Sequence, residues 1–314
     1  MNGEINIDHH LQYIARISHG KDSLKMLDVI FTRGLPLDRI TTADIWATET
    51  IRGEHPEMVT FKEMVDEYIW RKYRIEVEHL CAMKNGKKVT YERIFYHIPK
   101  RKPKKSWGGG GGTPQSQGTI LGFPTLWGPW CQSDLKREAR KTTIKAAFKV
   151  FRYNAEVGVR NSKSGFSECP AARGGINVVE YLGIAADEPE RFGQLTARKR
   201  APLVEFGIEE GLCGLYCQYE GILAPSYETS GRDGCWMCHN QGVNQLRQLR
   251  KRYPALWSLL LKWDGDSPVT FHADGHTVHD FEKRFQLEDE HFLVPGDKRF
   301  RWKMIEEDLQ KTMF

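Results

Sequence analysis

The chain has 314 residues, of which 40% are hydrophobic and 28% charged, a composition typical of globular proteins rather than of disordered or fibrous ones. Its formal net charge of +5 permits binding of phosphate-bearing ligands without demanding a nucleic-acid partner. No apolar run approaches the roughly 18–20 residues of a membrane-spanning helix, and no basic segment followed by an apolar core opens the chain. We therefore expect a cytoplasmic protein with no membrane association, whose oligomeric state the sequence does not indicate.

Strands and helices are expected to alternate in the first part of the chain. The expected strands are Tyr13–Ile17, Ile40–Ala47 and Arg74–Leu80, and the expected helices cover 23–34 and 59–73. Gly34 and Pro36 should end the first helix. A further buried strand is expected in NVVEYLGIA, a helix interrupted at Pro254 in NQLRQLRKRYPALWSLLLKW, and a strand or turn before the helix of APLVEFGIEEGLCGLYCQYEG. This alternation predicts a parallel sheet in an α/β fold.

The six residues Ser18–Ser23, SHGKDS, lie between the first expected strand and the first expected helix. Gly20 allows the backbone to turn tightly, and the N–H groups and dipole at the start of the helix favour an anion. Lys21 adds a positive charge, and the Ser18 and Ser23 hydroxyls donate hydrogen bonds. The loop therefore predicts a phosphate site, although it lacks the G-x-x-x-x-G-K-[ST] spacing of a Walker A loop.

SHGKDS resembles the SGGKDS loop of the adenine-nucleotide alpha-hydrolase superfamily, the PP-loop ATP pyrophosphatases, with His19 at a position usually held by glycine. Three later segments resemble the phosphoadenosine phosphosulfate (PAPS) reductase family within that superfamily: GFPTLWGPWCQSDLK, YLGIAADEPERF, and APLVEFGIEEGLCGLYCQYEG followed by SGRDGCWMC. The resemblance spans roughly residues 11–260. It implies a doubly wound, mostly parallel sheet that binds an adenine nucleotide at the C-terminal edge of its strands.

The resemblance also implies roles for individual residues. It assigns nucleotide-phosphate binding to Ser18, His19, Gly20, Lys21, Asp22 and Ser23, places Thr48 and Glu49 near the nucleoside, and places Asp187, Glu188 and Arg191 at the rim of the site. Lys21, Asp22 and Arg191 are the expected catalytic residues. Reductases commonly carry arginine at the position of Ala185, so Arg191 would have to contact the sulfate or 3′-phosphate instead. A solvated helix start with a local ion pair is the alternative for residues 187–191.

This interpretation divides the chain into two regions. We expect a PP-loop nucleotide-binding α/β domain over residues 1–200, and a mostly helical, cysteine-containing region over 201–314 packed on it. The stretch 98–118 is basic and glycine-rich, which predicts a flexible loop. That loop is interpreted as a solvated connection, with an arm for phosphate-rich polymers or a lid over the site as alternatives.

The seven cysteines are an odd number, and in a reducing compartment such clusters indicate metal or redox chemistry more often than disulfides. Cys235 and Cys238 form a C-x-x-C in a glycine-rich turn, and Cys213 and Cys217 lie four apart on an expected helix. By resemblance to the family's iron–sulfur members, a [4Fe–4S] cluster is expected on four thiolates: Cys131, Cys217, Cys235 and Cys238, with Cys213 as substitute. Structural zinc and a metal-free set of thiols are the alternatives, and Cys81 and Cys169 are expected to be bystanders.

The expected function is that of a PAPS-reductase-family enzyme in sulfur metabolism or sulfur transfer. It would bind PAPS, adenylyl sulfate or ATP and use a thioredoxin-like reductant or a sulfur donor. The family's reductases carry a nucleophilic cysteine in an E-C-G-x-H segment near the C-terminus, whereas this chain has no cysteine after Cys238. One alternative is an ATP-dependent adenylating or thiolating enzyme that uses Mg²⁺ and acts on tRNA or DNA. The other is a non-catalytic nucleotide- and metal-binding module.

Overall fold

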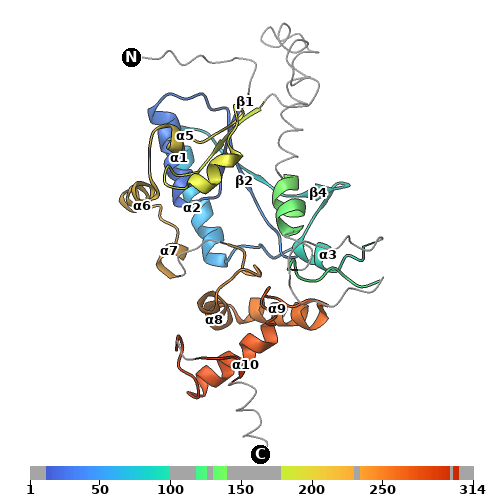
Figure 1. Ribbon diagram of the computed structural model, residues 1–314. Coiled ribbons are helices and arrows are strands. Elements are labelled where there is room, and N and C mark those ends of the chain that lie inside the picture. Colours follow the sequence, from blue (N-terminus) through green and yellow to red (C-terminus); the bar gives the residue numbers. More distant parts are fainter. Residues whose placement is uncertain are drawn as a thin grey trace, which may run out of the picture. The chain divides into compact units, whose positions relative to one another are not determined.

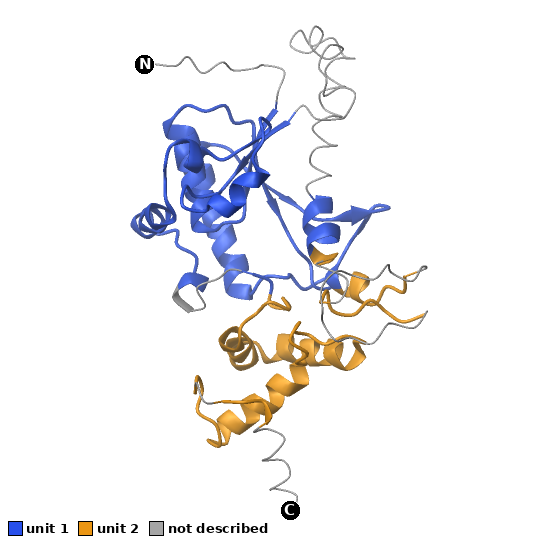
Figure 2. Cartoon of the chain, in the orientation of Figure 1, with its two compact units in different colours: residues 1–91, 132–235 blue, residues 92–131, 236–314 orange. Residues whose placement is uncertain are grey.

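The computed structural model describes residues 12–99, 118–125, 130–139, 178–229, 234–297 and 300–303. The chain forms two compact units, coloured separately in Figure 2: residues 1–91 with 132–235, and residues 92–131 with 236–314. This division differs from the boundary at residue 200 expected from the sequence, because helices after that residue pack within the first unit. In the described part of the chain, no helix combines the length and the apolar character needed to cross a membrane.

A five-stranded parallel sheet forms the centre of the first unit (Figure 1). Its strands, in spatial order, are β3 (Val77–Leu80), β2 (Arg39–Ala43), β1 (Gln12–Ile17), β6 (Val178–Leu182) and β7 (Lys199–Arg200). All four pairings are parallel, and Ala15 of β1 is aligned with Ile40 of β2 on one side and Tyr181 of β6 on the other. The sheet confirms the predicted α/β class.

The central strand β1 is buried on both faces. Tyr13, Ala15 and Ile17 belong to the main hydrophobic core, whereas Ile14 packs with Val178 in a separate small cluster. Successive side chains of a strand point to opposite faces, so burial of both faces requires a nearly continuous apolar run. That run is the pattern from which the strand was predicted.

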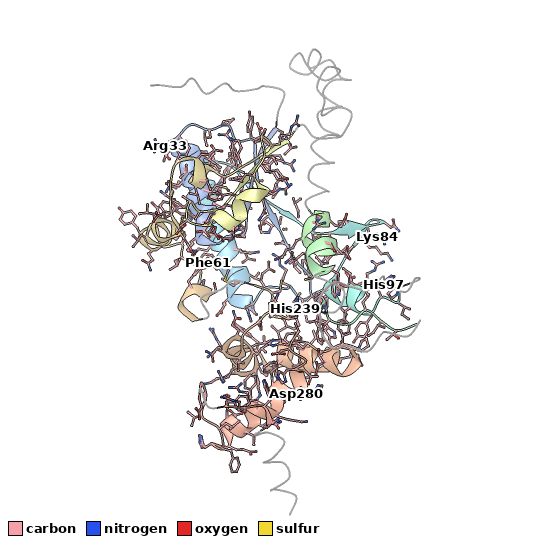
Figure 3. All side chains as sticks on the ribbon, viewed as in Figure 1. Arg33, Phe61, Lys84, His97, His239 and Asp280 are labelled. Carbon is pink, nitrogen blue, oxygen red and sulfur yellow. The ribbon has the colours of Figure 1, made fainter. Side chains whose placement is uncertain are left out.

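Two helices connect the first three strands. They are α1 (Lys21–Thr32) and α2 (Pro56–Tyr73). In α1, Leu24, Leu27 and Ile30 are buried at helical spacing and face the main core, which also contains Phe61 of α2, labelled in Figure 3. Gly34 follows the end of α1 with a φ of 62°, a conformation that glycine adopts without strain, as expected for a helix terminator.

Three more helices follow β7: α5 (Pro202–Glu205), α6 (Glu210–Tyr219) and α7 (Ser226–Thr229). Both α5 and α6 pack against α1. The sequence predicted a strand or turn before α6, and the structure has the short helix α5 there, because Pro202 suits a first helical turn and lacks the N–H that a strand would need.

Smaller elements complete the first unit. They are the antiparallel hairpin β4 (Met83–Lys84) with β5 (Lys87–Lys88), a π-helical segment Gln132–Arg137, and a 3₁₀ helix Pro189–Gln194. In the hairpin turn, Asn85 and Gly86 have φ values of 53° and 74°, as a tight two-residue turn requires. The short helix α3 (Tyr91–Phe95) lies where the first unit ends and the second begins.

The second unit is mostly helical, as predicted for the C-terminal part of the chain. Its main helices are α8 (Val243–Arg252), α9 (Pro254–Asp266) and α10 (Val278–Asp289). The predicted interruption at Pro254 separates α8 from α9. Trp263 of α9 stacks with two aromatic rings, with centroid distances of 5.5 Å to Trp236 and 5.9 Å to Phe95. These indoles form the core of the unit rather than an exposed stacking platform.

Candidate functional site

The loop Ser18–Ser23 connects the C-terminal end of β1 to the first turn of α1. From β1, the order of strands runs to β2 and β3 on one side and to β6 and β7 on the other, so the sheet changes direction beside this loop. In open parallel sheets, ligands bind at the C-terminal ends of the strands at such a switch point. The sequence placed the loop correctly between a strand and a helix, and the tertiary structure places it at the switch point.

The loop turns through a left-handed residue and then reaches the N-terminus of α1. His19 has a φ of 61°, a conformation that costs a residue with a Cβ about 1–2 kcal/mol relative to glycine. Gly20 precedes the first helical residue, and no side chain caps α1. The Ser23 hydroxyl donates to the Gly20 carbonyl over 2.8 Å and accepts from the Ser18 amide over 3.3 Å, so it closes the turn. The uncapped first-turn amides are suited to an anion.

Lys21 carries the positive charge of this edge and is ion-paired. Its Nζ lies 2.5 Å from Glu210 Oε1 at the start of α6 and 3.4 Å from Asp22 Oδ1. Burial lowers the Lys21 pKa, but the hydrogen bond to Glu210 and the charge of Asp22 outweigh it and raise the pKa overall. Burial also raises the pKa of Asp22 despite the neighbouring ammonium. A phosphate at this loop would compete with Glu210, which is 53% exposed, for the ammonium group.

The loop after β6 lies at the same edge of the sheet and contacts the starts of α1 and α6. A Cβ added to Gly183 would meet the backbone of Ser23 at 2.9 Å, so only glycine fits here without displacing the start of α1. Asp187 Oδ1 accepts from the Glu210 amide over 2.9 Å and thereby caps α6. The structure therefore brings Lys21 of the first loop and Asp187 of the β6 loop to the same end of α6.

The other predicted rim residues make local contacts. Glu188 accepts from the Ala185 amide over 3.1 Å and from Arg191 Nη1 over 2.7 Å. Burial raises the pKa of Glu188, but the Arg191 guanidinium and the Ala185 amide together outweigh this effect and hold the pKa below its usual range. The arginine expected to contact a sulfate or 3′-phosphate is thus paired with Glu188 in this structure.

Thr48 and Glu49 lie several residues beyond the end of β2 at Ala43, and both stabilise the local turn. The Thr48 hydroxyl accepts from the Ile51 amide over 3.0 Å. The Glu49 carbonyl accepts from Lys88 Nζ of the hairpin over 3.1 Å. Their predicted position near a nucleoside stays a prediction.

A series of side-chain hydrogen bonds, which sequence reasoning missed, links the loop to α2, to β3 and to the end of β2. His19 Nε2 lies 2.7 Å from Asp66 Oδ1 on α2, and Asp66 Oδ2 lies 2.8 Å from His79 Nε2 on β3. His79 Nδ1 lies 3.0 Å from Asp44 Oδ2, and the same oxygen is 2.8 Å from Arg52 Nη1. His19, Asp44 and His79 lie at the C-terminal ends of three adjacent strands. The sequence did not indicate this placement for Asp44, because the expected strand ran to Ala47, whereas β2 ends at Ala43.

The two histidines of this series have different electrostatic surroundings. Hydrogen bonds to Asp44 and Asp66 raise the pKa of His79 to about 9. Burial lowers the pKa of His19, whose ring is fully buried, even though Asp66 opposes the effect. Burial raises the pKa of both Asp44 and Asp66, but hydrogen bonds outweigh it, from His79 at Asp44 and from His19 and His79 at Asp66, so both pKa values lie below the usual value. Near neutral pH, these surroundings favour an imidazolium at His79 and a neutral ring at His19.

The cysteines of α6 are core residues in this structure. Cys213 and Cys217 are fully buried in the main hydrophobic core, and the Cys217 thiol donates to the Lys21 carbonyl over 3.6 Å. Burial raises the pKa of both thiols to about 12. Both are therefore protonated thiols in this structure, whereas iron and zinc bind thiolates.

Cys131 and Cys238 belong to the second unit, and Cys235 ends the first. No three His, Cys, Asp or Glu side chains among the described residues are grouped as a metal site. The shared site of Cys131, Cys217, Cys235 and Cys238, with Cys213 as substitute, stays a prediction. Of the two expected bystanders, Cys81 contacts Met83 Sδ at 3.6 Å, and Cys169 lies outside the described residues.

Neither a protein-family model, nor a curated protein, nor a solved structure matches the chain.

Proposed function

We propose that the chain is a PP-loop enzyme related to the PAPS reductases, which binds an adenine nucleotide at Ser18–Ser23 and acts in sulfur metabolism or sulfur transfer. One observation carries the proposal: the loop lies at the switch point of the parallel sheet, between the ends of β1 and β6. An uncapped helix N-terminus and the Lys21 ammonium meet there, a combination suited to phosphate.

In this proposal the protein acts mainly by positioning and by neutralising charge. The first-turn amides of α1 bind the phosphates, and Lys21 exchanges its contact with Glu210 for a phosphate oxygen. Because Gly183 has no Cβ atom, its Cα packs directly on the first turn of α1 without displacing the amides of that turn. Asp187 and Glu210 hold the end of α6 beside the loop.

The state of the thiols favours ATP-dependent activation as the second candidate. Sulfonucleotide reduction needs a nucleophilic thiolate, but Cys213 and Cys217 are buried, with pKa values raised to about 12. In the alternative, a substrate oxygen attacks the α-phosphorus of ATP. The bond from that phosphorus to the bridging oxygen breaks, pyrophosphate leaves with the electron pair, and an adenylated substrate remains.

These proposals include two metal sites, one for Mg²⁺ and one for an iron–sulfur cluster or zinc. Mg²⁺ would enter with ATP and share its phosphate charge. The [4Fe–4S] cluster, or zinc in its place, is proposed on Cys131, Cys217, Cys235 and Cys238. The buried, protonated state of Cys217 does not fit a thiolate ligand in this conformation, so no step is assigned to the cluster.

The test is a calorimetric titration of the full chain with ATP, adenylyl sulfate and PAPS. Lys21→Ala should weaken binding of the preferred nucleotide by about 10- to 100-fold, the cost of losing one charge-assisted contact. Lys25→Ala removes the same charge one turn later in α1, where the ammonium pairs with Asp28, and should leave affinity unchanged. Binding of none of the three nucleotides, or equal affinity of both variants, would contradict the proposal.

A further inference from the structure

His19 is an unusual residue for the turn it occupies. Its φ of 61° is a conformation that glycine adopts freely, yet the residue here is a large, fully buried histidine. A side chain at such a position must be held by its surroundings. The hydrogen bond of 2.7 Å to Asp66 is the contact that holds it, and the ring's Nδ1 has no hydrogen-bond partner.

We propose that His19 is a positioning residue of the nucleotide loop, tethered through Asp66 to His79 and Asp44 so that the ends of β1, β2 and β3 hold the first turn of α1 in place. The inference rests on the proposed nucleotide site, because it assigns the tether a purpose there. The tether itself consists of contacts between described side chains, so it can be tested without a ligand.

The geometry determines where the protons of this tether lie. Asp66 presents one carboxylate oxygen to each histidine, and an ionised carboxylate can only accept hydrogen bonds. His19 Nε2 therefore carries a proton and donates it to Asp66. Both nitrogens of His79 face carboxylate oxygens, at 3.0 Å and 2.8 Å, so both must donate and the ring is an imidazolium.

This arrangement makes the tether depend on the charge of His79. Asp44 and Asp66 face His79. The charged and titratable groups around His19 are Asp66, His79 and Lys62. Those around Asp44 are His79, Arg52 and Lys62, and Lys62 is itself paired with Glu54. When His79 loses a proton, one of its nitrogens turns a lone pair toward a carboxylate. That contact becomes repulsive, so either Asp44 or Asp66 must move.

The first arm of the test removes the tether at each end. His19→Gly keeps the left-handed turn accessible but loses the bond to Asp66, and Asp66→Ala removes the acceptor without altering the loop sequence. Glu63→Ala is the control, an exposed carboxylate on the same helix α2. Hydrogen exchange of the amides of residues 18–24 should become faster in His19→Gly and Asp66→Ala and stay unchanged in Glu63→Ala. Nucleotide affinity should fall by about tenfold in the first two variants, as for loss of one hydrogen bond to a charged group.

The second arm tests the dependence on pH. In the wild type, the protection factors of the amides of residues 18–24, which correct their exchange rates for base catalysis, should fall in a step as the pH rises through about 9, the pKa to which His79 is raised. His79→Gln should abolish this step. His97→Gln, at an exposed histidine of the second unit labelled in Figure 3, should retain it.

The outcomes separate the inference from the proposed function. Unchanged exchange of residues 18–24 in both His19→Gly and Asp66→Ala would overturn the tether, whatever the chain binds. Faster exchange in a chain that binds none of the three nucleotides would support the tether and contradict the nucleotide site. A pH step that persists in His79→Gln would overturn the role of the His79 charge.

Discussion

Gly183, the first residue after β6, lies so close to Ser23 in the first turn of α1 that a Cβ atom on it would be 2.9 Å from both the Cα and the backbone nitrogen of Ser23. These atoms are main chain and cannot rotate away as a flexible side chain would. The two residues are 160 positions apart in sequence, and their contact joins the β6 loop to the candidate phosphate loop.

The first prediction is that Gly183→Ala displaces the start of α1. The substitution should lower the free energy of unfolding by about 1–3 kcal/mol, as overpacking does, and weaken nucleotide binding by about tenfold. Denaturant unfolding and calorimetric titration measure the two effects. Gly193→Ala is the matched control, since a Cβ there meets no atom within 4 Å. Equal nucleotide affinity in the two variants would show that the contact with Ser23 does not shape the site.

The second prediction concerns the ion pair that occupies Lys21. Glu210→Gln removes the carboxylate that competes with phosphate for the ammonium, so nucleotide affinity should increase by about fivefold, equivalent to about 1 kcal/mol. Glu209→Gln changes the same charge at the preceding, exposed position and should have a smaller effect. Weaker binding in Glu210→Gln would instead give Glu210 a role in holding the nucleotide.

The third prediction concerns stability at alkaline pH. The pKa of His79 is raised to about 9 from an ordinary value of 6.5, so its contribution to folding is complete below pH 6.5 and is lost as the pH rises through 9. The ring is one-third exposed, so the loss should be on the order of 1–2 kcal/mol after solvent screening. Urea unfolding of the wild type and His79→Gln between pH 6 and 10 measures it. Parallel profiles for the two proteins would rule out the contribution.

The same tether predicts a loss of stability in acid. The pKa values of Asp44 and Asp66 lie below the ordinary 3.8, so their contribution is present above that value and is lost as the pH falls through the lowered pKa values. In Asp66→Asn, the free energy of unfolding should therefore depend less on pH below 4 than in the wild type. An unaltered acid profile would show that Asp66 is not ionised against the two histidines.

The fifth prediction concerns the metal. Anaerobically purified protein should contain about four irons per chain if a cubane is bound, or about one zinc if the site is structural. Serine at Cys235 or Cys238 should lose the metal, whereas Cys81→Ser should keep it. Metal retained in Cys217→Ser would assign Cys217 to the core alone, with Cys213→Ser testing the substitute ligand. Absence of metal from the wild type would leave the thiols as metal-free residues.

Local patterns in the sequence were enough to predict several elements. The apolar run at β1, the helical spacing of Leu24 and Leu27, and the interruption at Pro254 each depend on neighbouring residues, and the structure confirms all three. SHGKDS is local in the same sense, because a strand, a turn and a helix start follow one another in the chain. The position of α5 was missed, since four residues are too few to show a helical period.

The surroundings of the loop were decided only by the tertiary structure. His19, Asp44, Asp66 and His79 meet because parallel strands bring distant segments to one edge of the sheet, a relationship that no local spacing encodes. Likewise, the four-residue spacing of Cys213 and Cys217 predicts a shared helix face, but packing against α1 decides that this face is buried. Sequence alone thus determined which local elements form, whereas long-range packing determined which side chains meet at their ends.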